Sequence, residues 1–240
     1  RFIGIGTSLK YYLNQDGGSF SDITPIRSTT SAGDVTFAAS NGSATITVTD
    51  TAHGAVSGDF VTFSGAASLG GNITAGVLNQ EYNITEVIND DSYTIAARTA
   101  GTSIADITVD GALSPTPVTA NGSDTGNGGS SVVGAYQIGR GLDTSTFGAG
   151  WGIGFWGRGT WGSAASTPLV TSTLRVWTHD NFGEDLLMNV RNGGIYYWDK
   201  TGGVAARAVS LDSLAGATST PTIAKQILVS DRDRHIIAFG

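Results

Sequence analysis

Three tryptophans at regular intervals form the most unusual pattern in the sequence. In GAGWGIGFWGRGTWG, residues 148–162, Trp151, Trp156 and Trp161 fall every five residues, and seven of the fifteen residues are glycine. A period of five fits neither a helix nor a strand, and so many glycines are tolerable only if the indoles are buried. Burial in the domain's own core, contact with another subunit and stacking on sugar rings all remain open. Together with Arg158, the three tryptophans are the candidate subunit interface.

Carboxylates beside a histidine are the second group that could do chemistry. His179-Asp180 lies close in sequence to Glu184-Asp185, and glycoside hydrolysis needs two carboxylates roughly 5 to 10 Å apart. The same segment also fits a solvated turn, with Asp180-Asn181 breaking the regular structure. We favour the turn, because nothing else in the sequence predicts catalysis.

No pattern predicts a metal or a cofactor. His53, His179 and His235 lack a second His or a carboxylate at the spacing of a zinc site. Cysteine is absent, which excludes thiolate metal sites and thiol nucleophiles. The glycine-rich stretches lack the other residues of a dinucleotide fingerprint, a P-loop or a nucleophile elbow. The sequence therefore predicts no cofactor, no metal site and no enzymatic activity.

Short segments with alternating apolar and polar residues recur between Gly, Asn and Asp, and they predict strands. These segments are 43–49, 58–65, 81–88, 92–97 and 105–110. Asn89-Asp90-Asp91 and Asp231-Arg232-Asp233 lie between strand segments and are interpreted as hairpin turns. With 35 glycines in 240 residues and only 14% charged residues, a coiled coil or helical bundle is excluded. The predicted fold class is all-β.

The flanks of the chain repeat a hairpin pattern. The pair Tyr11-Tyr12 precedes a glycine pair at the same spacing as Tyr196-Tyr197 does, and residues 229–240 follow the order of strand, turn and strand in 188–198. Repeated hairpins that cannot bury their own faces are typical of propeller-like arrays. We therefore expect a propeller-like domain that is interrupted by other segments.

Composition separates the middle of the chain from its flanks. From Gly33 to Ala135 there are ten acidic residues, one basic residue and no Trp. The run NGSDTGNGGSS at 121–131 is too polar and glycine-rich to pack, and predicts a flexible linker. The expected organisation is 1–32, first part of the propeller-like domain; 33–120, inserted domain; 121–131, linker; and 132–240, second part with the Trp/Gly loop.

Charge and hydropathy restrict the partners. The formal net charge of −7 argues against a protein that coats nucleic acid. No apolar run approaches the roughly 20 residues that span a bilayer. The chain opens on RFIGIG and closes on RHIIAFG, so we expect both ends to be cut from something larger.

Three stretches carry a resemblance to a known group of proteins. SDITPIRST at 21–29, GWGIGFWGRGTWG at 150–162 and the segment 174–240 occur in this order, and together resemble virion structural proteins of tailed, especially short-tailed, bacteriophages. ITVTDTAHGAVSGDFVTFSGA at 46–66 is similar to a small β-barrel module of phage tail proteins, itself like the first catalytic-cysteine half-domain of ubiquitin-activating enzymes. Because the chain has no cysteine, this second resemblance implies a β-barrel at 33–120 and no enzymology.

The resemblance implies a tail component, at the tail nozzle or tail-tube end, that assembles into a ring. Its partners would be other copies of itself and other tail proteins, with a host surface receptor as a further candidate, and its location would be the virion. Passage of DNA through the assembly stays open. Two alternatives remain: a receptor- or glycan-binding tail module with the acidic domain as the recognition head, and a tail-borne glycan hydrolase.

Overall fold

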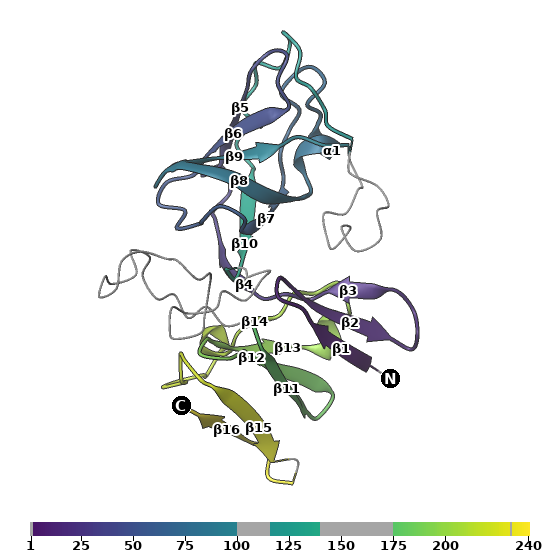
Figure 1. The fold of residues 1–240 in the computed structure, drawn as a ribbon, viewed down its shortest axis with the longest axis vertical. Helices are drawn as coiled ribbons and strands as arrows, with labels where there is room; N and C mark the ends of the chain where they lie inside the picture. The colour runs from purple at the N-terminus through teal and green to yellow at the C-terminus, as the bar shows by residue number, and fades with distance from the viewer. Residues whose placement is uncertain (1, 100–115, 140–174, 231) are drawn as a thin grey trace, which may run out of the picture. The chain divides into compact units, whose positions relative to one another are not determined.

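The computed structural model describes residues 2–99, 116–139, 175–230 and 232–240. These residues form antiparallel sheets with only short helical turns, so the predicted all-β class is confirmed. The chain divides into two compact units (Figure 1). The central unit is Thr24–Arg140, and the split unit consists of Arg1–Ile23 and Gly141–Gly240.

Seven strands form one antiparallel sheet in the central unit. In spatial order they are β4 (Ile26–Thr29), β10 (Val133–Gln137), β7 (Phe60–Ser64), β8 (Glu81–Asn89), β9 (Ser92–Ala96), β6 (Thr45–Thr49) and β5 (Thr36–Ala39). The strands predicted at 43–49, 58–65, 81–88 and 92–97 are confirmed as β6, β7, β8 and β9. The segment 105–110 lies outside the described residues.

The long strand β8 joins the two halves of this sheet. Its first residues pair with β7 and the rest with β9, and its register shifts between Ile84 and Glu86 and again after Val87. The sheet stays open, because its two edge strands, β4 and β5, do not pair with each other. β5 pairs with β6, and Phe37 in β5 also donates its N–H to the carbonyl of the loop residue Asn127. None of the sheets in the described residues closes into a barrel, so the expected closed β-barrel is not found.

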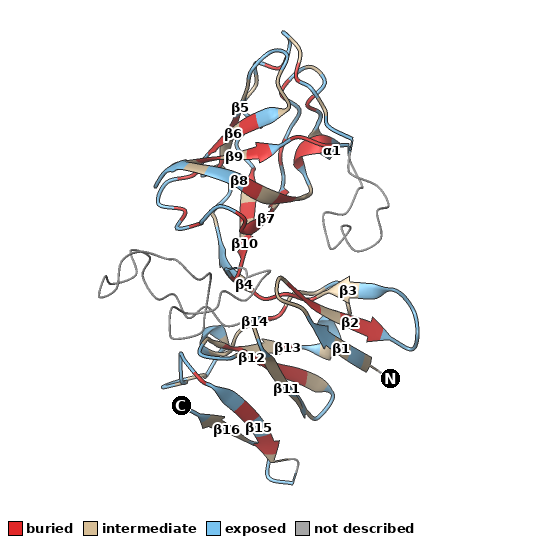
Figure 2. Ribbon diagram, in the orientation of Figure 1, coloured by how far each residue is buried: buried red, intermediate tan, exposed pale blue. Residues whose placement is uncertain are grey.

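Alternation along the strands builds the core of the central unit. Ile46 and Val48 in β6 lie directly opposite Ile95 and Tyr93 in β9, and all four are buried, so their side chains share one face of the sheet. Both strands carry buried segments, drawn in red in Figure 2. The short helix α1 (Ala75–Leu78) adds two further buried apolar residues, and the Thr74 side chain caps it. Because one face of each strand is apolar, burial of that face fixes the register of the sheet.

A hydrogen-bonded chain of phenols crosses the same core. The hydroxyls of Tyr93 and Tyr136 lie 2.8 Å apart, and Tyr136 donates to the buried carboxylate of Asp50 at 2.5 Å. The Arg27 guanidinium lies 5.2 Å from the ring centre of Tyr136. Burial, with Asp50 as acceptor, raises the pKa of Tyr136 far above its ordinary value. The phenol therefore remains a donor at neutral pH.

The segment 121–131 is ordered and belongs to the central unit, contrary to the predicted flexible linker. Gly126 donates its N–H to the carbonyl of Leu69 at 2.7 Å, and the Gly128 carbonyl accepts from Ala67 at 2.7 Å. Asp124 is buried within the segment and accepts four backbone hydrogen bonds. Backbone and carboxylate hydrogen bonds replace the apolar burial that the composition could not supply.

These contacts give a prediction about the boundaries of a foldable fragment. Residues 24–140 expressed alone are expected to fold cooperatively, whereas residues 33–120 are not, because the shorter fragment lacks β4, β10 and Asp124. Strand β10 lies between β4 and β7, so its loss exposes the edge of β7. Circular dichroism melts of the two fragments test this. Equally cooperative melts at the same temperature would contradict it.

Three smaller sheets make up the described part of the split unit. They are β1 (Phe2–Gly6), β2 (Tyr11–Gln15) and β3 (Phe20–Asp22); β11 (Trp177–Phe182), β12 (Asp185–Val190), β13 (Ile195–Trp198) and β14 (Val209–Ser210); and β15 (Gln226–Ser230) with β16 (His235–Phe239). The 3-10 turn Lys200–Gly202 lies between β13 and β14, and the 3-10 turn Leu211–Ser213 follows β14. The turns predicted at 89–91 and 231–233 do separate paired strands. The propeller-like arrangement is not confirmed and stays a prediction.

Strand β12 holds the split unit together because both of its faces are buried. Leu186 and Met188 pack with Tyr11 and Trp198, whereas Leu187 packs with Ile227 and its neighbours on the other side. A continuous apolar run is the pattern expected for a strand covered on both faces. The first cluster also includes residues from both sequence segments, which explains why the split unit contains the two ends of the chain.

Candidate functional site

A pocket of about 370 Å³ lies in the split unit, between the first sheet and the β11–β12 hairpin. One wall is polar and comes from the hairpin: His179, Asp180, Asn181, Glu184 and Asp185. The other side is apolar, with Phe2, Tyr11, Leu13, Leu186 and Trp198. The pocket thus brings together residues that are more than 160 positions apart in the sequence.

Asp180 is held by two backbone groups. Its Oδ1 accepts the N–H of Asn181 at 2.9 Å, and its Oδ2 accepts the N–H of Val229 in β15 at 2.8 Å. The second bond fastens the hairpin to β15. The carboxylate therefore faces β15, on the side of the hairpin that carries Leu187 and Phe182 and away from Tyr11.

Asp185 and Glu184 are also engaged. Asp185 accepts the backbone N–H of Lys200 at 3.0 Å and the hydroxyl of Tyr197. Burial, together with the Asp185 carboxylate, raises the pKa of Tyr197 to about 12, so this phenol donates at neutral pH. The Glu184 carboxylate forms an exposed ion pair with Lys200 at 2.7 Å.

The aromatic residues form a rigid floor. Tyr11 and Trp198 are 0% and 1% exposed. The Tyr11 ring packs edge-on against Trp177 at 5.1 Å and against His179 at 5.9 Å, and Phe2 packs edge-on against Trp198 at 5.6 Å. Burial raises the pKa of Tyr11 to about 12. With their faces packed, these rings shape the pocket and do not offer a flat stacking platform.

The structure alters the sequence interpretation of this segment. The expected break at Asp180-Asn181 is wrong, because both residues lie inside β11, opposite Leu187 and Leu186 of β12. The chain turns later, at Gly183, where φ is 72°. His179, Asp180, Glu184 and Asp185 do meet in one pocket, and backbone N–H groups, a phenol and a lysine set the positions of the three carboxylates.

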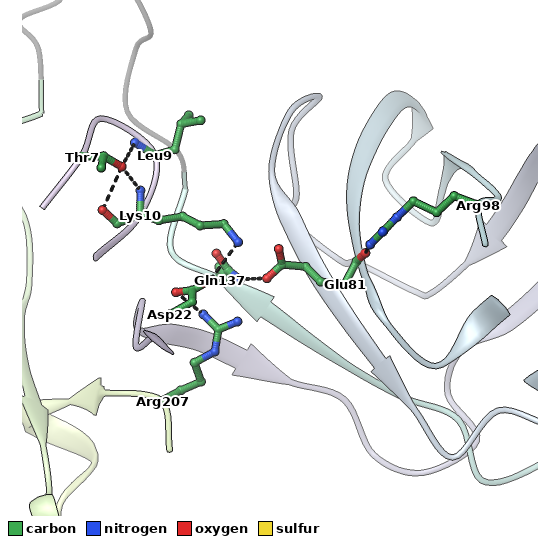
Figure 3. Close-up of polar contacts among 8 residues, drawn as sticks. All are labelled: Thr7, Leu9, Lys10, Asp22, Glu81, Arg98, Gln137 and Arg207. Carbon is green, nitrogen blue, oxygen red and sulfur yellow. Dashed lines mark hydrogen bonds and ion pairs between the residues drawn. The ribbon is translucent and has the colours of Figure 1, made fainter. Parts of the chain in front are cut away.

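A second charged cluster in the split unit joins strands instead of lining a pocket. The buried Lys10 lies 2.8 Å from one oxygen of Asp22, and Arg207 lies 2.6 Å from the other (Figure 3). In the central unit, drawn in the same figure, Gln137 donates to the Glu81 carboxylate and Arg98 to the Glu81 carbonyl. Each set of contacts ties together segments of its own unit.

The remaining candidate residues do not form a site in the described residues. His53 is buried in the central unit, where its Nε2 lies 3.0 Å from the Asn89 carbonyl and its Nδ1 accepts from Ala55. His235 is exposed in β16. Within the ranges that the structure describes, no group of His and carboxylates could hold a metal ion.

Trp151, Trp156, Trp161 and Arg158 fall outside the described residues, so their role as a subunit interface stays a prediction.

The acidic central unit, expected to be a recognition head under the receptor-binding alternative, contains a smaller pocket of about 180 Å³. Its lining includes Tyr82, Ala97, Arg98 and Pro117 and is largely apolar. This pocket indicates no particular ligand.

Among the helices in the described ranges, none combines the length and the hydrophobicity needed to cross a bilayer.

Comparisons with known proteins identify no family. No family model matches the sequence, and no curated protein matches it. Among solved structures, the chain is similar to the Phage phi92 endosialidase with a TM-score of 0.26 and 14% sequence identity. The match covers 85% of this chain but only 29% of that one. At this TM-score the likeness carries no argument about fold or function.

Proposed function

We propose that this chain is a structural component of a bacteriophage tail, that it has no catalytic activity, and that its copies assemble into a ring at the tail nozzle or tail-tube end. The observation that carries the proposal is the resemblance of 21–29, 150–162 and 174–240, in order, to virion structural proteins of tailed phages. Its partners would be other copies and other tail proteins, and its location the virion.

Exposed apolar faces in the split unit support an assembling protein. In the first sheet, Ile3 and Phe20 are 55% and 52% exposed. In the last hairpin, Leu228 and Ile237 lie directly opposite each other and are 47% and 43% exposed. Each of these sheets already buries its other face, so its outer apolar face is available to a neighbour. Apolar surface of this kind is typical of interaction sites.

Arginine supplies the polar part of the proposed contacts. The sequence contains ten Arg and three Lys. Arg207 and Arg175 are engaged within the split unit, by Asp22 and by the Trp177 ring. Arg191, Arg232 and Arg234 are exposed. Arg makes bidentate contacts with carboxylates, so these side chains suit ion pairs with an acidic neighbour.

The proposal predicts rings whose stability depends on salt. Electron micrographs of the purified chain at low ionic strength should show closed rings. Raising the salt to about 0.5 M should shift sedimentation toward monomers, because screening weakens exposed ion pairs. Rings unchanged by salt would contradict the role of arginine. A monomer at every concentration and ionic strength would contradict the ring itself, and a monomer that binds glycan would favour the receptor-binding alternative.

A further inference from the structure

Strand β16 is the outer strand of its two-stranded sheet and offers backbone hydrogen-bonding groups along one edge. Within the residues that the structure describes, it pairs with β15 alone (Figure 1). In β15, the Val229 N–H points away from β16, because it donates to Asp180 at 2.8 Å. Val229 and its partner Ile236 therefore form a non-hydrogen-bonded pair, and Ala238, two residues further on, faces the same way as Ile236. The peptide N–H and C=O groups of Ile236 and Ala238 thus lie along the outer edge of β16, where another strand can pair.

The sequence of β16 has none of the features with which edge strands usually prevent such pairing. HIIAF contains no Asp, Glu, Lys, Arg or Pro, and its register with β15 has no shift. The other strand of the hairpin differs, because the Asp180 side chain binds an outer N–H of β15. In the central unit, the edge strand β5 bonds to the loop through Phe37 and Asn127. A regular, uncharged edge such as that of β16 is expected to pair with another chain.

The two faces of β16 restrict what can pair with it. Ile236 and Ala238 face the interior of the split unit and pack with the cluster that contains Leu187. Ile237 and Phe239 face outward and are 43% and 49% exposed. A strand added at this edge continues both faces of the sheet, so a partner that is apolar on both faces fits best.

A second copy of β16 meets this requirement. In an antiparallel pair, only the register centred on Ile237 uses all five residues of both strands. It places Ile236 opposite Ala238 of the second copy as a hydrogen-bonded pair, and Ile237 opposite its own counterpart between two such pairs. On the outer face, Phe239 then lies opposite His235 of the second copy. Every pair in the ladder is therefore apolar or aromatic.

We propose that β16 pairs with β16 of a second copy around a two-fold axis at Ile237, so that the two hairpins form one continuous sheet. The exposed Arg232 and Arg234 lie in the turn before β16, and the axis places the two turns at opposite ends of the ladder, where like charges stay apart. A two-fold contact cannot by itself close a ring of more than two copies, so this contact is separate from those of the proposed ring. It would join two rings or two free copies.

Single cysteines test the register, because the chain has no cysteine of its own. Opposite residues of a non-hydrogen-bonded antiparallel pair have Cα atoms roughly 4.5 Å apart, a distance that a disulfide can bridge. On mild oxidation of the full chain, Ile237→Cys should therefore give a disulfide-linked dimer. Leu228→Cys is the matched control, because Leu228 lies opposite Ile237 on the same face and is similarly exposed. The two copies of residue 228 would lie roughly 14 Å apart across the proposed sheet, so this variant should give no dimer.

A proline variant separates strand pairing from random encounter. The Ala238 N–H points away from β15, so Ala238→Pro removes a bond of the proposed ladder and none of the hairpin. Added to Ile237→Cys, it should slow disulfide formation at least about tenfold, because the two copies lose two backbone hydrogen bonds. The circular dichroism spectrum should stay unchanged.

The cross-linking yields decide the proposal. Absence of a dimer from Ile237→Cys, or equal yields from the two cysteine variants, would overturn it. So would a proline variant that folds and cross-links as fast as Ile237→Cys alone. Rings without this cross-link would overturn the two-fold contact and leave the ring intact, whereas a cross-linked dimer without rings would support the contact and contradict the ring.

Discussion

Asp124→Ala is expected to lower the free energy of unfolding of the central unit by about 3 to 5 kcal/mol. The side chain is 4% exposed. Its two oxygens accept the backbone N–H groups of Gly71, Asn72, Ile73 and Asn121 at 2.8 to 3.0 Å. Alanine would leave four donors without this acceptor and would release the segment 121–131 from the loop around residue 71. Urea denaturation of parent and variant measures the effect.

A second aspartate provides the control. Asp34 is exposed and accepts one backbone N–H, from Ser31 at 3.0 Å. Asp34→Ala should therefore cost less than about 1 kcal/mol. If both variants lost the same free energy of unfolding, the four hydrogen bonds to Asp124 would stabilise the unit no more than the single bond to Asp34 does.

The same carboxylate predicts a dependence on pH. Burial alone would raise the pKa of Asp124, but the four backbone N–H donors outweigh it and hold this pKa below its ordinary value. Such a group stabilises the fold above its ordinary pKa, and that contribution is lost as the pH falls through the lower native value. The stability of the parent should thus decline more steeply below about pH 4 than that of Asp124→Asn. Parallel curves would contradict this.

The alternation of apolar and polar residues was sufficient to predict strands β6 to β9 of the central unit. It was not sufficient to predict that the segment 121–131 is ordered. β6, β7, β8 and β9 each alternate apolar and polar residues, a signal contained within a few neighbouring positions. The run 121–131 has the composition of a flexible linker. Its order comes from contacts about 50 residues away, as between Asp124 and Gly71, and a local pattern carries no information about them.

For the same reason, the sequence predicted the hairpin side of the pocket but not the side that comes from the N-terminal strands. The grouping of His179 and Asp180 with Glu184 and Asp185 is visible in the sequence, because a hairpin brings them together. Phe2, Tyr11 and Leu13 come from the far end of the chain, and no spacing rule links them to residue 180. The one available signal was the repeated tyrosine pair, which marks β2 and β13 as related aromatic strands.

Gly65→Ala is expected to destabilise the central unit by about 3 kcal/mol or more. Gly65 follows β7 and has a φ of 73°, where an L side chain is strained. A Cβ there would also collide with the backbone carbonyl oxygen of Ser131. That carbonyl cannot move away freely, because Val133, two residues later, pairs with Ser64 in the sheet. Relief of the collision would separate β10 from β7.

Gly42→Ala distinguishes the collision from the backbone strain. Gly42 has a similar φ of 81° in the same unit, but a Cβ there would meet nothing within 4 Å. This variant should lose only about 1 kcal/mol, the cost of a left-handed conformation. Urea denaturation of the two variants therefore isolates the contribution of the close backbone approach, about 2 kcal/mol. If both variants were destabilised equally, the backbone at Ser131 would move away from the new Cβ at little cost. The segment 121–131 would then be packed less tightly against β7 than its contacts indicate.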